Sequence, residues 1–345
     1  GHAVNRRGGN GKCDFKLKPP VIDVTNGRQS PNYRTTLEKG TMMEMTAAAE
    51  QQIREWSAGL DSDVVLRYAL CGHAQDASIS AFVEQVAALS DRVRPKKEND
   101  APVVRPTLFA GDHVAYQALP LDRELEPFLF ALAAKGRAFG DRIAADTRRR
   151  LARLRAPALL TVYVTAPCPF CPTTLATVLG LAASSDFVWV TVIDGQTFPE
   201  AARKDRVSAA PTVILDDRLR WTGSVDPDEL VTLMLDRDPA NLGTEALRGM
   251  IEAGDAQGVA EMMVTRGALF PAFIELLAHP RWSVRLGAMV AFETLAEETA
   301  ALAGQVVEPL LAAFPGADQT VKGDLLYVIG ESNNQAALPF LREVA

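Results

Sequence analysis

Cys168 and Cys171 are the side chains best placed by type and spacing to do chemistry. They stand in Thr165-Ala-Pro-Cys-Pro-Phe-Cys-Pro172, between an apolar run typical of a strand and a run with helical periodicity. A helix N-terminus favours a thiolate, and Cys-x-x-Cys spacing lets a second thiol close a disulfide on the first. The motif therefore predicts a redox-active dithiol in which Cys168 is the nucleophile and Cys171, one turn inside the helix, resolves the mixed disulfide.

Four neighbouring residues are candidates for binding a substrate. Pro169 suits the first turn of a helix, and Phe170 would present an apolar surface beside the thiols. Ala210-Pro211 immediately precedes a predicted strand, where a cis proline would expose backbone groups to an extended peptide. The sequence alone does not determine the isomer of that bond.

The elements that must position these residues form a pattern that occurs twice. The first copy predicts helices at 47–57, 79–89 and 121–134, with strands at 64–70 and around Leu108 and Val114. The second predicts helices at 138–154, 173–183, near Pro199 and at 227–235, with strands at 159–164, 187–193, Val213 and Leu219. The pattern indicates an α/β fold with two tandem units, each with a parallel strand pair followed by an antiparallel pair.

Beyond about residue 241 the pattern predicts helices only, at 269–277, 284–295, 306–314 and 321–329. We therefore expect four regions: a disordered or non-native lead-in at 1–45, α/β units at 46–137 and 138–240, and helical repeats at 241–345. The run Glu38-Lys-Gly-Thr-Met-Met43 raises the hypothesis that the native chain starts at Met42 or Met43.

The α/β part resembles the protein disulfide oxidoreductase family, glutaredoxin-like proteins with two tandem thioredoxin folds. The resemblance lies in Pro167-Cys-Pro-Phe-Cys-Pro172, Phe198-Pro-Glu-Ala-Ala202, Val207-Ser-Ala-Ala-Pro211 and Leu119-Pro-Leu121. It implies that Cys168, Cys171 and Pro211 are the nucleophile, the resolving thiol and the cis proline. It also implies disulfide-containing protein substrates, no bound cofactor, and reducing equivalents from NADPH through a flavoprotein of the thioredoxin reductase type.

The first unit departs from the family pattern. Cys71-Gly-His-Ala74 lacks the second cysteine, so a two-thiol cycle cannot run there, although Pro106 remains. We interpret Cys71, His73 and Pro106 as a vestigial site with an inert thiol. The alternative is that Cys71 forms a mixed disulfide with a substrate, with no nearby second thiol to release it. His73 either lowers the pKa of Cys71 or is a solvated loop residue, which is the commoner case.

The helical part is similar to HEAT-like repeats, chiefly in Trp282-Ser-Val-Arg-Leu-Gly-Ala288. Such stacks commonly present a surface to protein partners, so we expect protein docking there. For Trp282 and Arg285 we favour helix packing and helix-end hydrogen bonding over docking. Together with the degenerate unit, the helices are expected to select what reaches Cys168.

Composition narrows the class of protein. A net charge of −7 argues against nucleic acid as a partner, and no apolar run reaches the roughly 20 residues of a membrane span. Four cysteines are too few for a disulfide-stapled secreted scaffold, which favours a cytoplasmic protein. Zinc needs four ligands, and the residues left to complete a site around the dithiol are Cys13 and Cys71, with His73, His113 and His279 in different contexts, so no metal site is expected.

The favoured interpretation is a cytosolic thiol–disulfide oxidoreductase. One alternative is a redox-responsive scaffold or sensor that binds a partner through the helical repeats. Another is an electron donor to a peroxiredoxin.

Overall fold

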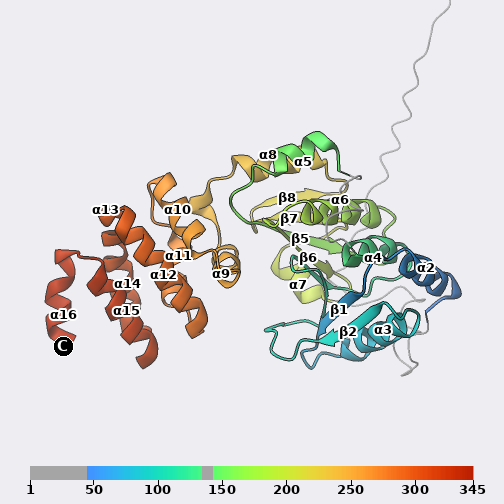
Figure 1. The fold of residues 1–345 in the computed structure, drawn as a ribbon, viewed down its shortest axis with the longest axis horizontal. Coiled ribbons are helices and arrows are strands. Elements are labelled where there is room, and N and C mark those ends of the chain that lie inside the picture. Colours follow the sequence, from blue (N-terminus) through green and yellow to red (C-terminus); the bar gives the residue numbers. More distant parts are fainter. Residues whose placement is uncertain (1–44, 134–142, 345) are drawn as a thin grey trace, which may run out of the picture.

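A computed structural model describes residues 45–133 and 143–344 of the chain (Figure 1). Cys13 and the proposed start at Met42 or Met43 lie outside the described residues, as does almost all of the predicted lead-in. The first residues of the helix predicted at 138–154 also lie outside them, and the structure gives a shorter helix there, α5 (Ala145–Leu151).

One eight-stranded mixed sheet forms the centre of the α/β part, in the order β2-β1-β3-β4-β6-β5-β7-β8. The strands are β1 (Val64–Ala69), β2 (Val93–Lys97), β3 (Thr107–Ala110), β4 (Val114–Gln117), β5 (Ala158–Val164), β6 (Val188–Asp194), β7 (Thr212–Leu215) and β8 (Leu219–Thr222). The helices are α2 (Ala47–Ala58), α3 (Asp76–Ala88), η1 (Asp122–Glu124), α4 (Leu125–Ala133), α5, α6 (Cys171–Ala183), α7 (Pro199–Lys204) and α8 (Pro227–Asp236).

The strand pairing within each unit agrees with the duplicated pattern. β1 pairs with β2 and β5 with β6 in parallel, whereas β3 pairs with β4 and β7 with β8 antiparallel. The central strand β5 reads Ala-Leu-Leu-Thr-Val-Tyr-Val and is largely buried, as expected for a strand covered on both faces. These local patterns were enough to place the strand on which the Cys168 motif depends.

The two units are joined edge to edge by β4 and β6, which pair in parallel from Val114 opposite Val190 to Gln117 opposite Ile193. A single hydrophobic core follows the sheet across this joint, with Phe82 and Phe128 from the first unit and Leu230 from the second. The units are therefore fused into one body.

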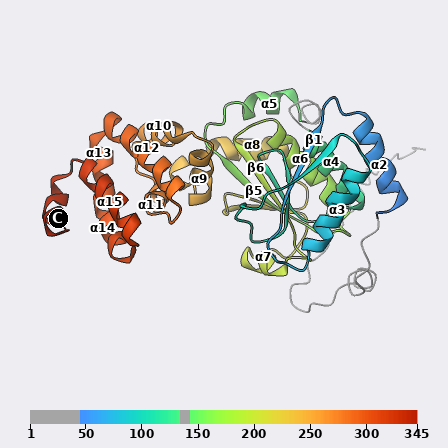
Figure 2. The same ribbon diagram turned by 60° about the horizontal axis from the view of Figure 1, so that its bottom comes forward.

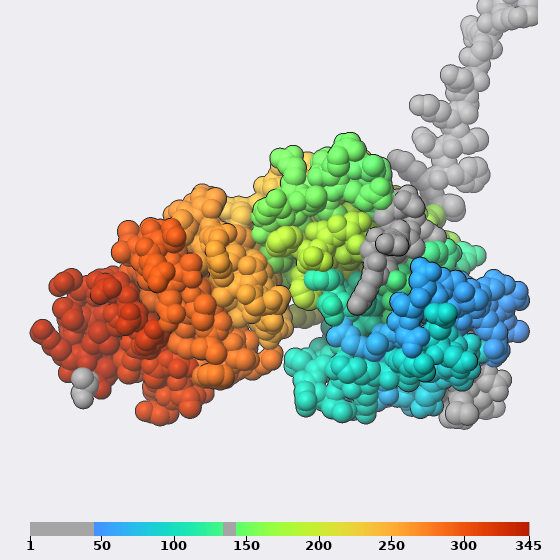
Figure 3. Space-filling model, in the orientation of Figure 1, coloured from blue at the N-terminus to red at the C-terminus, as the bar shows by residue number. Residues whose placement is uncertain are grey.

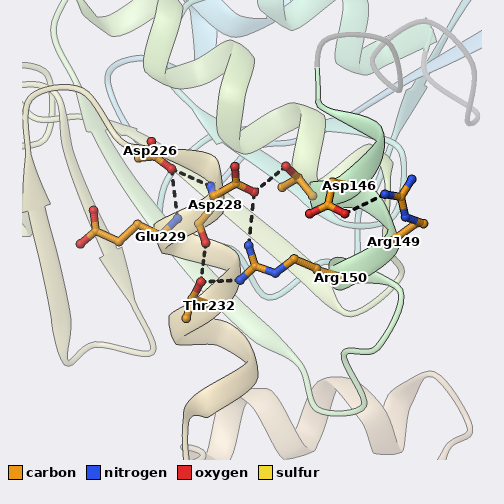
Figure 4. A network of polar contacts seen from close by, with 8 residues as sticks. Asp146, Arg149, Arg150, Asp226, Asp228, Glu229 and Thr232 are labelled. Carbon is orange, nitrogen blue, oxygen red and sulfur yellow. Dashed lines mark hydrogen bonds and ion pairs between the residues drawn. The ribbon is translucent and has the colours of Figure 1, made fainter.

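Helix α5 is tied to α8 by polar contacts (Figure 4). Thr147 Oγ1 donates to Asp228 Oδ1 at 2.6 Å, and Arg150 bonds the same carboxylate at 3.3 Å. Asp226 caps α8 by accepting the backbone N–H groups of Asp228 and Glu229 at 2.8 and 3.1 Å. These contacts hold the segment that leads into β5.

A separate lobe of helices follows the sheet (Figures 1 and 3). Its elements are η2 (Pro239–Asn241), α9 (Thr244–Glu252), α10 (Ala256–Arg266), α11 (Pro271–Leu277), α12 (Trp282–Glu298), α13 (Ala300–Ala303), η3 (Gly304–Val306), α14 (Val307–Ala313), η4 (Phe314–Gly316), α15 (Gln319–Glu331), η5 (Gln335–Ala337) and α16 (Leu338–Val344). Most of its buried residues form a second hydrophobic core. Among the described residues, no helix combines the length and apolar character that crossing a bilayer requires.

The helical lobe meets the sheet through α9, which lies next to the sheet in both ribbon views (Figures 1 and 2). A Cβ on Gly249 of α9 would lie 3.9 Å from the ring of Trp189 in β6. A cleft of about 690 Å³ opens there, lined by Leu159 and Trp189 near the starts of β5 and β6 and by residues of α9. The contact lies at the opposite end of these strands from Cys168, which follows the end of β5.

Candidate functional site: a buried dithiol

Cys168 and Cys171 lie together where the chain passes from β5 into α6. The Cys168 Sγ accepts the backbone N–H of Cys171 at 3.2 Å, and both thiols are free and buried. Helix α6 begins at Cys171, two residues before the predicted start, so Cys171 opens the helix and does not lie one turn inside it. Pro169 consequently precedes the helix, and the proline of the first turn is Pro172.

The two thiols have opposite acidities. A hydrogen bond from the Cys171 thiol, aided by the backbone N–H groups of Phe170 and Cys171, lowers the pKa of Cys168 to about 6 against the effect of burial. The same hydrogen bond, followed by burial, raises the pKa of Cys171 far above that of a free thiol. This asymmetry gives Cys168 the properties of the nucleophile and leaves Cys171 protonated until it is needed.

The loop before β7 completes the site. The Ala210–Pro211 peptide bond is cis, and the Cys168 thiol donates to the Ala210 carbonyl oxygen at 3.4 Å. Thr212 Oγ1 anchors the loop by donating to the Ala209 carbonyl at 2.7 Å. The structure thus brings Ala210 and Pro211 to the dithiol, as expected, and leaves the ring of Phe170 partly exposed beside it.

Sequence analysis missed two buried carboxyl groups near the thiols. Glu124 of η1 accepts a hydrogen bond from Tyr116 at 3.0 Å through Oε2, while its Oε1 is buried without a hydrogen-bond partner. Burial, the charge of Asp194 and a Cys168 thiolate raise the pKa of Glu124 to about 8, against the lowering effect of Tyr116. The negative charge of Glu124 in turn contributes to the high pKa of Cys171.

Asp194 ends β6 on the other side of the joint between the units. Burial raises its pKa, although Thr197 Oγ1 and the backbone N–H groups of Gln196 and Thr197 bond to it. Two acids at the joint are not a recognisable motif, because they come from different units. The sequence contains no signal for Glu124, because it stands in the charged run Asp122-Arg123-Glu124-Leu125-Glu126 and nothing there marks it as the buried member.

The vestigial residues of the first unit do not form a second dithiol site. Cys71 is exposed, and its N–H and that of Gly72 donate to Asp76 at 3.4 and 2.7 Å. His73 Nδ1 accepts the N–H of Gln75 at 3.1 Å, and its ring packs on Phe198 of the second unit with centroids 5.2 Å apart.

Pro106 lies in a small pocket with Phe198 and Asp194, and its peptide bond with Arg105 is not cis. The Arg105 guanidinium lies over the Phe198 ring, 5.9 Å from the centroid. This loop is therefore a packing contact between the two units. Within residues 45–133 and 143–344, no cluster of three or more His, Cys, Asp or Glu side chains is arranged to hold a metal ion.

Comparisons with known proteins bear on the fold of this region. A family model described as thioredoxin domain matches residues 159–235. The protein disulfide oxidoreductase from Aeropyrum pernix K1 aligns with a TM-score of 0.50 at 15% identity, over 56% of this chain and 93% of that one. The NTD_N/C domain of alkylhydroperoxide reductase AhpF from Enterococcus faecalis aligns at 0.47 and 17%, over 55% and 100%. No curated protein sequence matches.

Residues 159–235 thus form a thioredoxin domain, within an eight-stranded α/β region that resembles tandem thioredoxin-like folds. A helical region follows it. The Cys168 and Cys171 pair at the start of α6 indicates thiol–disulfide redox chemistry.

Proposed function

We propose that the chain is a thiol–disulfide oxidoreductase that reduces or exchanges disulfides of protein substrates through Cys168 and Cys171. The observation that carries the proposal is the Cys168 sulfur, held by the Cys171 N–H at 3.2 Å and facing the Ala210 carbonyl before a cis proline. An extended substrate segment would pair with the backbone at Ala210, which places its disulfide over Cys168. Phe170 and Pro169 would contact its apolar side chains.

In the first step the Cys168 thiolate attacks one sulfur of the substrate disulfide. A Cys168–substrate disulfide forms, the substrate S–S bond breaks, and the departing sulfur leaves as a thiolate that takes a proton from water. In the second step Cys171 loses its proton and attacks Cys168 Sγ, which releases the second substrate thiol and leaves the Cys168–Cys171 disulfide. The substrate gains two electrons and the dithiol loses two.

Glu124 is the proposed proton acceptor for Cys171 in the second step. Its Oε1 has no hydrogen-bond partner, and its pKa of about 8 makes the ionised carboxylate, a minor fraction at pH 7 that grows as pH rises toward 8, a stronger base for a thiol proton than an ordinary glutamate. We expect Glu124→Gln to slow release of the mixed disulfide while leaving alkylation of Cys168 fast. Stopped-flow kinetics would measure formation and release of the mixed disulfide as two phases. Equal slowing of both phases in Glu124→Gln would contradict the proposal.

Reduction of insulin disulfides by dithiothreitol tests the activity itself. The wild-type chain should accelerate reduction, Cys168→Ser should remove the acceleration, and the matched Cys71→Ser variant should keep it. Replacing dithiothreitol with NADPH and a thioredoxin reductase tests the proposed source of electrons. A Cys171→Ala variant should trap substrates on Cys168, and recovery of such adducts from cytoplasm would also support the proposed location.

We further propose that the helical lobe is a short HEAT-like stack in which α11 and α12, and α14 and α15, are successive pairs. Its separate core favours a second candidate function, a redox-responsive protein that binds a partner through this lobe. That function predicts a reversible Cys168–Cys171 disulfide without catalytic turnover of insulin.

A further inference from the structure

An apolar ridge lies uncovered on α12. Trp282, Leu286 and Val290 follow one another at intervals of four residues, so they share a face of the helix, and they are 60%, 41% and 46% exposed. The expectation that Trp282 packs within the lobe was wrong. The expectation for Arg285 is confirmed, because this buried side chain donates to the His279 and Pro280 carbonyls at the helix start.

Helix α15 extends this face beside the ridge. Arg285 of α12 bonds Asp324 of α15 at 2.7 Å, and the Tyr327 hydroxyl donates to Glu293 of α12 at 2.6 Å. Tyr327 is 45% exposed, and Gly323, one turn before it, has no atoms near the position of a Cβ. The Trp282, Leu286, Val290 and Tyr327 side chains thus form one apolar surface, the α12–α15 face, with an open place at Gly323.

The charges around this face are negative. Glu293 and Glu297 continue the exposed side of α12, and Glu331 lies one turn beyond Tyr327 on α15. The basic groups near the face are already engaged: Arg281 bonds Glu252 at 2.8 Å, Arg285 is buried, and Lys322 Nζ lies over the Phe314 ring, 5.4 Å from its centroid. A positively charged partner would therefore meet uncompensated carboxylates here.

We infer that the α12–α15 face binds a positively charged amphipathic α-helix of a partner protein. The ridge from Trp282 to Val290 is about 12 Å long at 1.5 Å per residue, which matches the apolar stripe of two to three turns of a helix. Trp282 and Tyr327 supply the aromatic anchors that dominate such interfaces, and the glutamates receive lysines or arginines that flank the stripe of the partner.

A labelled synthetic peptide tests this inference directly. The probe is a leucine and lysine amphipathic helix of about five turns, titrated with the full chain and followed by fluorescence anisotropy. We expect saturable binding that weakens with salt, and at least a tenfold loss of affinity in Trp282→Ser and in Leu286→Ser. Val104→Ser, at an apolar position in the first unit that is 75% exposed, is the matched control and should bind normally. Circular dichroism should show the variants folded.

Three results would overturn the inference. A matched leucine and glutamate peptide that binds equally well would show that charge does not select the partner. Unchanged affinity in Trp282→Ser would place the binding elsewhere. Self-association of the wild-type chain that Trp282→Ser abolishes in light scattering would identify a second copy as the occupant. Peptide binding does not depend on the thiols, so Cys168→Ser should bind the peptide normally. The test therefore remains valid even if the redox proposal fails.

Discussion

At the scale of single residues, the chemistry of the site depends on a difference between two identical side chains. Cys168 precedes the helix and accepts hydrogen bonds, whereas Cys171 opens the helix, donates a hydrogen bond from its thiol to Cys168, and keeps its proton through this bond, burial and the charge of Glu124. One thiol is therefore ionised near neutral pH and the other is not. The order of attack that we propose follows from this difference.

The rate at which iodoacetamide alkylates Cys168 should follow its thiolate population. Because the pKa of Cys168 is lowered to about 6, the rate should rise as pH passes through this value and level off well below the pKa of about 8.5 of a free thiol. Cys171→Ala removes the largest cause of the lowering, so its profile should move to higher pH. Mass mapping of the Cys168 peptide gives the rate, and a wild-type midpoint near 8.5 would contradict the prediction.

Glu124 should make the free energy of unfolding depend on pH. Its pKa rises from 4.5 to about 8 on folding, so between these values the folded state holds a proton that the unfolded state has lost. The protonated group contributes fully to the free energy of unfolding below pH 4.5, and this contribution is lost as pH rises through 8. At 1.4 kcal/mol per pKa unit, the loss is roughly 4 to 5 kcal/mol at most.

Urea denaturation across pH 4 to 9 in the wild-type chain and in Glu124→Gln measures this effect. The variant should lose the part of the decline that Glu124 causes, since glutamine does not titrate, and keep the part that comes from Asp194, whose pKa burial also raises. Glu84→Gln on the exposed side of α3 is the control and should keep the wild-type dependence. Parallel pH profiles in all three chains would assign the dependence to other groups.

At the scale of elements, two glycines in helices should respond oppositely to alanine. A Cβ on Gly287 of α12 would overlap Ile251 Cγ2 of α9, a branched side chain that has little freedom to move, whereas Gly323 of α15 faces open space. Gly287→Ala should destabilise the helical lobe by about 1–3 kcal/mol, and Gly323→Ala should stabilise it by about 0.5–1 kcal/mol.

Urea denaturation followed by circular dichroism compares the two variants. In a double-mutant cycle, Gly287→Ala should cost less in an Ile251→Ala background than in the wild-type chain, because the added Cβ then no longer meets the Ile251 side chain. A gain in stability in Gly287→Ala alone would show that α9 and α12 separate easily.

Elements in which apolar residues recur at a regular spacing could be predicted from the sequence. Examples are β5, α6 and α12. β2 could not, because Pro95 and two lysines are typical of loops, yet they suit an edge strand. The pair of thiols was likewise visible in the sequence. Glu124 was not, because its environment is set by tertiary contacts: Tyr116 of β4 donates to it, and Asp194 at the end of β6, which pairs with β4, lies close enough to raise its pKa.

At the scale of the whole molecule, the sheet and the helical lobe have separate cores that touch at α9. A chain that ends at Asp238 should therefore fold and reduce insulin within about twofold of the full chain, since a domain with its own core can fold alone. The insulin assay and circular dichroism measure this. An unfolded or inactive product would show that the sheet needs the helices.

The position of α9 has a consequence for how the molecule can be used. The thiols stand at one end of β5 and the helical lobe is attached near the other. A protein bound to the lobe, as proposed, would leave the thiols unobstructed, so partner binding and disulfide exchange would take place at opposite ends of β5. Such tethering would raise the effective concentration of the thiols near a protein bound to the lobe, and it would not require that protein to contact Cys168 at the binding surface.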